Sequence, residues 1–537
     1  MQTEVLIIGS GPTGLSLAIE LGSRSIPCVV IERNERVGYA PRAKTTNVRT
    51  REHLRRWGIA EKLAEASPLG LDYPSTIKFV TRLNGYALAS FENGLDCSPE
   101  KNAFYSEHAQ WIPQYTLEEV LRLHAQSLPC VQIRFMTELD SFVQDNNGVK
   151  ATVRNLASGT VETIDSRYLV GADGARSTVR DAIGAKMEGK YGLSRNYNVV
   201  FRAPGLAQAH AHGQAIMYWQ VNGEVPSLIG PMDTGDRWFF MPTNVAPDLK
   251  LTHDEAAALI RKATGIDLPY EILSSDEWVA SRLIADKYRD RRVFLAGDAC
   301  HLHPPMGGYG MNMGVADGVD LGWKLAATVQ GWGGERLLGS YEAERRPVHN
   351  FVMDEAVANH AVLGAQLFQA GIENADEDGE RIRACATEQI QRQKAREFKN
   401  LGVVLGYRYH DSAVIVSDGS PEAPYDSTAF TPCARPGCIA PHAWLDDDRS
   451  LYDTFGTGFT LLVAGSPDNN DSAALERATR EAAEASVPLT ISAPAHKGLD
   501  ELYEARFALI RPDQHVAWRG DTWPDDGVSV FRRVSGQ

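Results

Sequence analysis

The first apolar run of the chain passes directly into a glycine turn and then into a second apolar stretch. Val5 to Ile8 predicts a buried strand, and Gly9-Ser10-Gly11-Pro12-Thr13-Gly14 follows it without a gap. Leu15 to Leu21 predicts a helix, and the next apolar run, Cys28 to Ile31, ends on Glu32. This order of strand, glycine turn, helix and strand predicts a βαβ unit of the length that binds a dinucleotide.

Each glycine of the turn has a separate role in such a unit. Gly9 permits the tight turn, Gly11 lets the backbone approach a pyrophosphate, and Gly14 lets the helix pack closely on the strand. The phosphates are expected at the helix N-terminus. Glu32 is placed to accept hydrogen bonds from the two hydroxyls of an adenosine ribose, and its charge disfavours a 2′-phosphate there. The unit therefore predicts FAD or NAD, rather than NADP, in this site.

The rest of the chain predicts a nucleotide-binding domain interrupted by a β-rich insertion. A helix capped by Thr116 precedes the insertion, and from about 185 to 284 the pattern changes to short β-like runs with aromatic residues. The buried-strand pattern returns at Arg292 to Ala296 and continues into Gly297-Asp298. A helix is then predicted from about Gly314 through Ala327.

The last part of the chain has the pattern of a separate small unit. Strands are predicted at 459–463 and 489–491, a helix near 472–485, and a hairpin turn at Arg511-Pro512-Asp513-Gln514. This order fits a thioredoxin-like fold. Because the unit has no CxxC pair, a dithiol redox module is not expected.

Composition restricts the partners and the compartment. The chain has 537 residues, of which 43% are hydrophobic and 23% charged, as in an ordinary globular protein with several domains. Its net charge of −15 disfavours nucleic acid, and no apolar run reaches the ~18 residues of a membrane span. The seven cysteines contain no CxxC pair, which predicts reduced thiols in a cytoplasmic protein. A strand that begins at about residue 3 leaves no room for a signal peptide.

Three motifs taken together resemble the single-component, or group A, FAD-dependent aromatic hydroxylases. They are Gly9 to Gly14 with Glu32, Gly171-Ala172-Asp173-Gly174 with Arg176, and Gly297-Asp298 through Pro304-Pro305 to Gly310-Met311-Asn312. The C-terminal unit is similar to the thioredoxin-like tail of the phenol, hydroxyphenylpropionate and aromatic-polyketide hydroxylases. The predicted fold class is therefore α/β, with a Rossmann-like FAD-binding domain, an inserted β-sheet substrate domain and a thioredoxin-like C-terminal domain.

The expected boundaries follow from these patterns. They are 1–75, 105–184 and 285–400 for the FAD-binding domain with a helical linker at its end, 76–104 for an excursion toward the substrate domain, 185–284 for the substrate domain, and 401–537 for the C-terminal domain.

The resemblance also implies which residues hold the cofactors. Asp298 is expected to bind the FAD ribityl chain, Arg42 and Gln114 to contact the cofactor, and Asp173 to act through local structure and NAD(P)H. A helix that opens just after Asn312 would direct its N-terminal amides at the flavin pyrimidine, where negative charge develops on reduction. The full expected set is Gly9, Gly11, Pro12, Thr13, Gly14, Glu32, Arg33, Arg42, Gln114, Asp173, Asp298, Pro305, Gly307, Gly308, Gly310, Met311 and Asn312.

The activity that the resemblance implies is hydroxylation of an aromatic ring. Such enzymes take a hydride from NAD(P)H, bind dioxygen at the reduced flavin and transfer one oxygen through a flavin C4a-hydroperoxide. The implied substrate is a small phenolic or polyketide aromatic. The chain has no second GxGxxG for a nicotinamide cofactor, as suits this family. A homodimer is compatible with the sequence, which contains no feature that fixes the oligomeric state.

The sequence indicates the substrate-contacting residues less clearly than the cofactor-contacting ones. No catalytic base is assigned, and Tyr218, Trp219 and Trp238 are pocket candidates because they lie on β-like runs of the insertion, although plain core is the commoner role of such residues. His301 and His303 have an i, i+2 spacing that suits metal ligands on a strand, but no third ligand pattern lies nearby, so no metal is expected. Cys433 and Cys438 are expected to be structural.

Two other functions are compatible with the same motifs. The scaffold can host a Baeyer–Villiger oxidation of a ketone, and a flavin-binding protein without oxygenase activity would share the dinucleotide site. The intact Asp298 and the loop before the later helix argue against the second of these.

Overall fold

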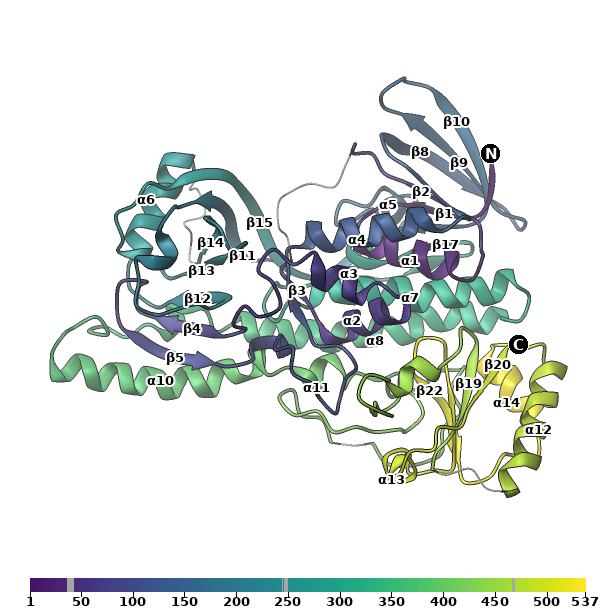
Figure 1. The fold of residues 1–537 in the computed structure, drawn as a ribbon. Helices are drawn as coiled ribbons and strands as arrows, with labels where there is room; N and C mark the ends of the chain where they lie inside the picture. The colour runs from purple at the N-terminus through teal and green to yellow at the C-terminus, as the bar shows by residue number, and fades with distance from the viewer. Residues whose placement is uncertain (36–42, 244, 246–249, 423, 466–468) are drawn as a thin grey trace.

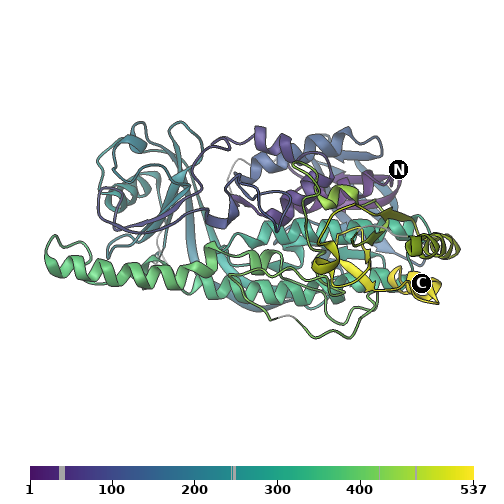
Figure 2. The same ribbon diagram turned by 60° about the horizontal axis from the view of Figure 1, so that its bottom comes forward.

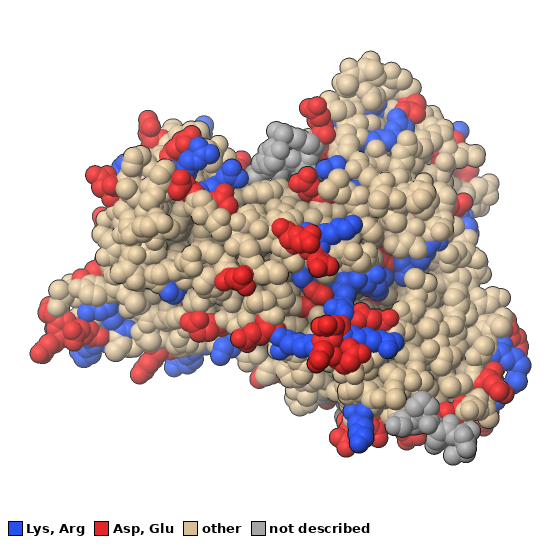
Figure 3. Space-filling model, viewed as in Figure 1, with Lys and Arg blue, Asp and Glu red and all other residues tan. Residues whose placement is uncertain are grey.

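The computed structural model of this protein describes residues 1–35, 43–243, 245, 250–422, 424–465 and 469–537, and Arg42 lies outside these residues. Figures 1 and 2 show two large sheets joined by long strands, and a smaller sheet near the C-terminus. Long helices run from one large sheet toward the other. Acidic and basic side chains are interspersed on the face shown in Figure 3, so no field of a single sign covers that face.

The first sheet contains the predicted βαβ unit at its centre. Strand β1 is parallel to β2 on one side and to β10 on the other, and β10 is parallel to β17. The strands of this sheet are β1 (Gln2–Ile8), β2 (Cys28–Ile31), β7 (Val131–Arg134), β8 (Thr137–Gln144), β9 (Val149–Asn155), β10 (Val161–Gly171), β16 (Arg289–Asp290) and β17 (Val293–Leu295). Val5, Leu6 and Ile7 are fully buried, as expected of a central parallel strand covered on both faces.

Register brings the strand ends of this sheet to one edge. Ile8 is paired with Ile31 and with Gly171, and Gly171 is paired with Leu295. The turns that follow these four strands therefore emerge side by side. In open parallel sheets this carboxyl edge is where ligands bind.

Four long helices pack around the first sheet. They are α1 (Pro12–Gly22), α4 (Gln114–Ser127), α7 (Tyr309–Val329) and α8 (Glu335–His360). Apolar residues of α1 and α7 share one core with the sheet, and the other side of α1 packs with α4. Helix α7 begins at Tyr309, so the prediction of a start near Gly314 was too late.

The second sheet assembles from segments far apart in the chain. Its strands, in spatial order, are β18 (His301–Leu302), β15 (Glu271–Ala285), β11 (Met187–Arg202), β14 (Arg237–Pro242), β13 (Ser227–Pro231), β12 (Met217–Gln220), β4 (Ile77–Val80) and β5 (Ala87–Phe91). Helix α6 (His253–Thr264) covers one face, and α10 (Glu377–Phe398) packs against β5. The strand that follows Gly297-Asp298 thus belongs to this sheet.

The C-terminal sheet has the order β20-β19-β21-β22. Strand β19 (Phe459–Val463) is parallel to β20 (Leu489–Ser492) and antiparallel to β21 (Phe507–Ile510), which forms a hairpin with β22 (Val516–Gly520). The helices of this unit are α12 (Asn469–Glu484), α13 (Leu499–Tyr503) and α14 (Gly527–Val534). Its core is continuous with buried side chains of α7 and α8.

The remaining elements are short. They are α2 (Val48–Arg56), α3 (Ala60–Glu65), α5 (Thr178–Ala182), α9 (Gly364–Leu367), α11 (Leu401–Val404), β3 (Thr45–Thr46), β6 (Gln110–Trp111) and the 3₁₀ turns at Gly94–Asp96, Leu206–Gln208, Gly297–Ala299 and Leu451–Thr454. Among the described residues, no helix combines the length and the apolarity needed to cross a bilayer.

Buried charges hold the C-terminal unit to α7 and α8. The hairpin turn between β21 and β22 carries Arg511, whose guanidinium lies 2.7 Å from Oε1 of Glu344 and 3.1 Å from Oδ1 of Asp320. Lys324 contacts the same two carboxylates at 2.6 and 2.8 Å. The turn predicted at Arg511 is therefore also one of the contacts that join the C-terminal unit to the rest of the protein.

Candidate cofactor site

Two of the three glycines in the first turn are required by packing, and the third is not. Gly9 has a φ of +105°, and a Cβ there would lie 2.3 Å from the carbonyl oxygen of Ala172. A Cβ on Gly14 would lie 2.1 Å from the Gly9 carbonyl oxygen. At Gly11 no protein atom lies within 4 Å of that position. The surface beside Gly11 can therefore accept the close approach of a pyrophosphate.

The N-terminus of α1 is suited to an anion. Pro12 is its first residue, no side chain caps it, and its first turn contains no acidic residue. Backbone N–H groups at such a terminus lack helical partners and favour negative charge.

Glu32 lies beside this turn and is oriented by it. Its Oε2 accepts hydrogen bonds from the backbone N–H of Ser10 at 3.1 Å and from the Ser10 hydroxyl at 3.2 Å. Its Oε1 accepts from the backbone and side chain of Asn34 at 2.9 and 2.7 Å. The carboxylate is thus held at the end of β2, where a ribose would lie. Arg33 is exposed next to it.

The Gly297-Asp298 turn packs directly on the first glycine turn. Gly297 has a φ of +63°, and a Cβ on it would lie 2.4 Å from the Thr13 hydroxyl. Gly297 and Ala299 are buried, whereas Asp298 is exposed at the carboxyl edge of the sheet. Two motifs separated by almost 300 residues are therefore in contact at Thr13.

Small residues of α7 let this helix approach α1 closely. A Cβ on Gly314 would lie 2.4 Å from the Thr13 hydroxyl, one on Gly318 would lie 2.7 Å from the Thr13 carbonyl oxygen, and one on Gly322 would lie 2.5 Å from Cβ of Glu20. Glycines four residues apart share one helix face, so this face can lie against α1 along two turns. The N-termini of α1 and α7 consequently open at the same edge.

The start of α7 is a glycine-rich turn without a capping side chain. Gly307 and Gly308 have φ angles of +91° and +67°, and Gly308 is the N-cap. The first turn of α7, which contains Gly310 and Met311, has no acidic residue. Its amides can therefore face an electron-rich group. Pro305 is exposed just before this turn.

Asn312 fixes the start of α7 to β3 and α2. Its Nδ2 donates to the carbonyls of Thr45 and Gly308 at 2.9 and 2.7 Å, and its Oδ1 accepts from the Asn47 backbone and the Thr50 hydroxyl at 3.0 and 2.7 Å. Asn312 is buried, so its side chain stabilises the start of α7 from the protein interior.

Gln114 and Asp173 lie at the same edge of the sheet, but their side chains have different hydrogen-bond partners. Gln114 begins α4, its Oε1 accepts from the backbone N–H of Ala43 at 3.2 Å, and it remains partly exposed. The Asp173 carboxylate accepts from the Ser177 hydroxyl at 2.5 Å and from the Val179 backbone at 3.1 Å. Burial raises the pKa of Asp173. The turn that starts α5 therefore holds this carboxylate.

A buried network beneath the Gly297 turn was not predicted from the sequence. Asp317 of α7 accepts from the Gly297 backbone at 3.0 Å, pairs with Arg345 at 2.8 Å, and contacts His301 and His349 at 2.7 and 2.9 Å. Burial alone would raise the pKa of Asp317, but the three basic neighbours outweigh it and hold the pKa well below its usual value. Burial lowers the pKa of His349 to about 3. The network fixes the turn that presents Asp298.

Cys300, His301 and Asp317 place three potential metal ligands within 4.8 Å of one another. Both oxygens of Asp317 already accept hydrogen bonds, and the Arg345 guanidinium lies 2.8 Å away, which opposes a cation. The geometry favours a hydrogen-bonded network at this position.

The three aromatic pocket candidates lie on opposite faces of the second sheet. Tyr218 and Trp238 are buried in the core under α6, which is the role that the sequence made the commoner one for them. Trp219 lies on the other face and stacks on Phe79, with ring centroids 5.4 Å apart. Neighbouring strand residues alternate between faces, which explains why Tyr218 and Trp219 separate.

Lys44 and two aromatic residues occupy the space between the two large sheets. Nζ of Lys44 lies 4.3 Å from the ring centroid of Phe239, and the Trp111 and Phe239 centroids are 6.1 Å apart. The carbonyl of Lys44 accepts from Ile112, next to the Gln114 contact. Burial lowers the pKa of Lys44 to about 8. Lys44 stands in a basic stretch of the sequence, and such a stretch is usually a solvated surface.

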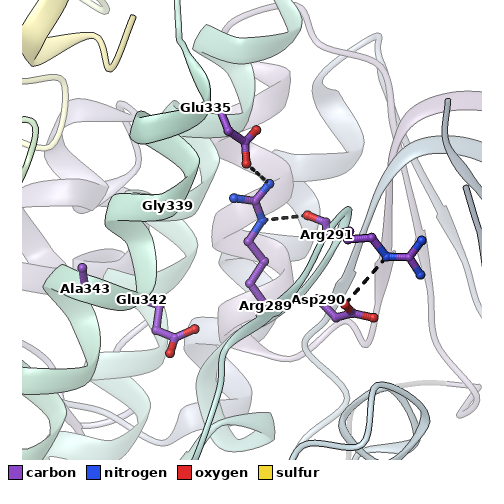
Figure 4. Close-up of a pocket in the computed structure, with 7 residues that line it drawn as sticks. All are labelled: Arg289, Asp290, Arg291, Glu335, Gly339, Glu342 and Ala343. Atoms are coloured by element: carbon purple, nitrogen blue, oxygen red, sulfur yellow. Dashed lines mark hydrogen bonds and ion pairs between the residues drawn. The ribbon is translucent and has the colours of Figure 1, made fainter. Parts of the chain in front are cut away.

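A separate surface hollow of about 550 Å³ lies between β16 and α8 (Figure 4). Arg289 pairs there with Glu335 at 2.7 Å and donates to the Arg291 carbonyl at 2.7 Å, while Arg291 pairs with Asp290 at 3.8 Å. These charges satisfy one another on the amino-end side of β17. The hollow is distinct from the cofactor edge.

Comparison with known proteins relates most of the chain to one family. The profile described as FAD binding domain matches residues 2–356, and the profile described as the C-terminal region of aromatic-ring hydroxylases matches residues 433–537.

Curated relatives align along nearly the full length. The 4-methyl-5-nitrocatechol 5-monooxygenase of a Burkholderia species is 34% identical, covering 98% of this chain and 95% of the relative. The tetracenomycin B2 monooxygenase-dioxygenase of Streptomyces olivaceus is 33% identical, covering 99% and 98%.

Solved structures agree with this similarity. The rebeccamycin biosynthetic enzyme RebC with reduced flavin superimposes with a TM-score of 0.91 at 34% identity, covering 100% of this chain and 99% of that one. Aklavinone-11 hydroxylase in complex with FAD and aklavinone gives a TM-score of 0.83 at 29% identity, with the same coverage.

Proposed function

The chain belongs to the FAD-dependent aromatic-ring hydroxylases, and from this premise we propose that it hydroxylates a phenolic or polyketide aromatic substrate with NAD(P)H and dioxygen. It is an FAD-dependent monooxygenase. The observation that carries the proposal is the meeting of the Gly9–Gly14 turn, the Gly297-Asp298 turn and the N-terminus of α7 at Thr13. When bound, FAD accepts the hydride and activates dioxygen.

We assign each part of the cofactor to the group whose chemistry suits it. Glu32 accepts the ribose hydroxyls, and Gly11 with the N-terminus of α1 receives the pyrophosphate. Asp298 accepts from the ribityl chain, and the uncapped amides of α7 stabilise the negative charge that reduction places on the pyrimidine. Gln114 closes the site from α4. Arg33 and Arg42 are proposed to approach the phosphates from the chain after β2.

The substrate is proposed to lie between Lys44, Phe239 and Trp111. The aromatic side chains offer stacking surfaces to a ring, and the Lys44 ammonium offers a partner to a phenolate or an acidic substituent. The names of the relatives suggest substrates that range from a single nitrocatechol ring to fused polyketides such as aklavinone. Removal of bulk solvent by the second sheet strengthens the effect of one positive charge on such an anion.

We propose that the domain boundaries follow the predicted division. Strands β4 and β5 support an excursion at 76–104, because they add to the same sheet as β11 to β15. A thioredoxin-like C-terminal domain is supported by the βαβ order of β19, α12 and β20 followed by an antiparallel hairpin. A cytoplasmic location and a homodimer complete the proposal.

The direct test is a screen of phenols, phenolic acids and aromatic polyketides with the FAD-loaded protein. A hydroxylase consumes NAD(P)H faster with a substrate and yields a product heavier by one oxygen that retains its aromatic ring. A product that is instead an ester or lactone would identify a Baeyer–Villiger oxygenase. If no compound of the panel stimulates NAD(P)H consumption, the result would favour a flavin-binding protein without oxygenase activity.

A further inference from the structure

Two cysteines of the C-terminal unit lie in contact although the sequence separates them by four residues. Cys433 and Cys438 flank the turn Ala434-Arg435-Pro436-Gly437, and the backbone N–H of Cys438 donates to the Arg435 carbonyl at 3.0 Å. This turn folds the chain back on itself. The two thiols come within hydrogen-bonding reach of each other, with Cys433 as the acceptor.

The turn is held in place by the neighbouring hairpin. Gly437 has a φ of +98°, its N–H donates to the Val516 carbonyl at 2.8 Å, and the Val516 N–H donates to the Cys438 carbonyl at 2.9 Å. A Cβ on Gly437 would lie 2.3 Å from the Tyr409 carbonyl oxygen. The geometry that brings the sulfurs together is therefore fixed by the fold rather than by a flexible loop.

The surroundings shift the pKa values of the two thiols in opposite directions. The Cys438 thiol donates a hydrogen bond to Cys433 and lowers the pKa of Cys433. The Arg435 N–H and the charge of Arg519 lower it further, while partial burial and the charge of Glu504 raise it. The resulting pKa of Cys433 is about 6. The same hydrogen bond and burial raise the pKa of Cys438, although Arg408 and Arg435 lie nearby. Cys433 is partly exposed, whereas Cys438 is buried.

We propose that Cys433 and Cys438 form a peroxide-reactive dithiol that closes to an intramolecular disulfide. The Cys433 thiolate attacks one oxygen of hydrogen peroxide, the O–O bond breaks, and the departing hydroxide takes a proton to give water and a sulfenic acid. The Cys438 sulfur then attacks the Cys433 sulfur, the S–S bond forms, and the sulfenic oxygen leaves as water with the proton of the Cys438 thiol. Two thiols lose two electrons in total, and two waters form.

The fold supports this order of events. The partly exposed thiolate is the group that a peroxide can reach, and the buried thiol is protected from direct oxidation. Once Cys433 is a neutral sulfenic acid, the negative charge that helps to raise the pKa of Cys438 is gone. The resolving thiol is thereby activated only after the first step. The expectation that these cysteines are purely structural rested on the missing CxxC spacing, which does not exclude a longer turn.

Thiol mapping of the full-length, FAD-loaded protein tests the proposal. The reduced protein is treated with hydrogen peroxide, alkylated with iodoacetamide, digested and analysed by mass spectrometry. We expect the Cys433 and Cys438 peptides to be recovered joined, while exposed Cys385 stays largely alkylated. Cys438→Ser should accumulate a Cys433 sulfenic acid that dimedone traps, and Cys433→Ser should lose the joined product. Cys385→Ser is the matched control and should give the joined product at the wild-type rate.

A second readout does not depend on oxidation. The rate of Cys433 alkylation should rise with a midpoint near pH 6 in the wild type, below the ordinary thiol value of ~8.5, and with a higher midpoint in Cys438→Ala, which cannot donate the hydrogen bond. Flavin absorbance of each variant reports that it is folded. A wild-type midpoint near 8.5, or peroxide oxidation of Cys433 to the sulfinic acid in the wild type without the joined product, would overturn the proposal. Neither result bears on the hydroxylase function.

Discussion

Asp298 and Asp173 carry the same functional group at the same edge of the first sheet, but their surroundings give them different roles. Asp173 accepts two hydrogen bonds from its own turn. Asp298 follows a buried strand and is exposed where the cofactor edge opens. The hydrogen bonds of Asp173 support the expectation that this residue acts through local structure.

We expect Asp298→Ala to weaken FAD binding more than Asp173→Ala. Loss of a hydrogen bond to a charged group costs roughly 1.5–3 kcal/mol, or about a tenfold to a hundredfold rise in Kd. Asp173→Ala should instead lower the melting temperature, since it removes the partner of the Ser177 and Val179 groups that start α5. Titration of the apoprotein with FAD, followed by flavin fluorescence, measures the first effect. Equal FAD affinity in the Asp298→Ala variant and the wild type would refute the assignment.

Lys44 predicts a change of stability with pH. Its pKa is lowered by burial from 10.5 to about 8, so below pH 8 the folded state holds a charge in an unfavourable place. Between pH 8 and 10.5 the unfolded state binds more protons than the folded state, and stability rises with pH. Lys44→Met should therefore melt at a higher temperature than the wild type at pH 7, and this gain should disappear by about pH 10.5.

The matched control at this position is Lys44→Arg, because arginine stays charged over the whole range. Its melting temperature should stay below that of Lys44→Met at pH 10.5 as well as at pH 7. Thermal melts of the three proteins in buffers from pH 6.5 to 10.5 decide the point. A gain for Lys44→Met that is the same at both ends of the range would contradict a titrating ammonium.

At the scale of elements, the contact between α1 and α7 determines the site. Glycines 314, 318 and 322 bring the helices close enough for both N-termini to open at one edge. The sequence predicts the first βαβ unit well, because the strand, turn and helix are neighbours in the chain. It does not predict that Asp317 of α7 would reach the backbone of Gly297, because that contact depends on the packing of distant segments.

The same limit explains why the sequence left the role of the aromatic residues of the second sheet open. Alternation along β12 shows that Tyr218 and Trp219 point to opposite faces. Which face is covered by α6 and which faces the cofactor edge depends on how the whole sheet is placed. The β-like pattern alone therefore left both roles open for Tyr218 and Trp238, and the fold places them in the core with α6.

Gly318→Ala tests the helix contact. Its Cβ would lie 2.7 Å from the Thr13 carbonyl oxygen, so α7 must move away from α1. We expect a loss of about 1–3 kcal/mol in stability and weaker FAD binding. The control is Gly339→Ala on α8, where no atom lies within 4 Å of the new Cβ and the substitution should stabilise by about 0.5–1 kcal/mol. Urea denaturation of both variants separates packing from helix propensity, and similar effects of the two substitutions would argue against a close helix contact.

At the scale of the whole molecule, the C-terminal unit is attached through charges that are removed from water. Arg511 and Lys324 share the carboxylates of Glu344 and Asp320, and all four side chains are almost fully buried. Ion pairs of this kind contribute little net stability as a set, but removal of one member leaves an uncompensated charge. The hairpin turn was predictable from its proline and aspartate, whereas the carboxylates that receive it come from α7 and α8.

Arg511→Met should cost about 3–5 kcal/mol and loosen the C-terminal unit. The double variant Arg511→Met with Glu344→Gln should recover part of that loss, because it reduces the excess of negative charge that loss of Arg511 leaves in the cluster. Arg381→Met removes an exposed pair with Asp378 and should change stability by about 0.5 kcal/mol or less. Denaturation together with limited proteolysis between residues 405 and 460 measures both effects. A loss no greater than that of Arg381→Met would show that the buried pairs do not hold the unit in place.

The assembly of both large sheets from separated segments also has a consequence for how the chain folds as it leaves the ribosome. Strand β1 needs β10 and then β17, and the face of α1 that packs on α7 is not covered until α7 has been made, more than 280 residues after α1. At synthesis rates of roughly 5–20 residues per second, the apolar surface of the first βαβ unit stays partly uncovered for about 15 to 60 seconds. We therefore expect ribosome-bound chains that stop before α7 to remain sensitive to protease, and chains that extend beyond α8 to become resistant.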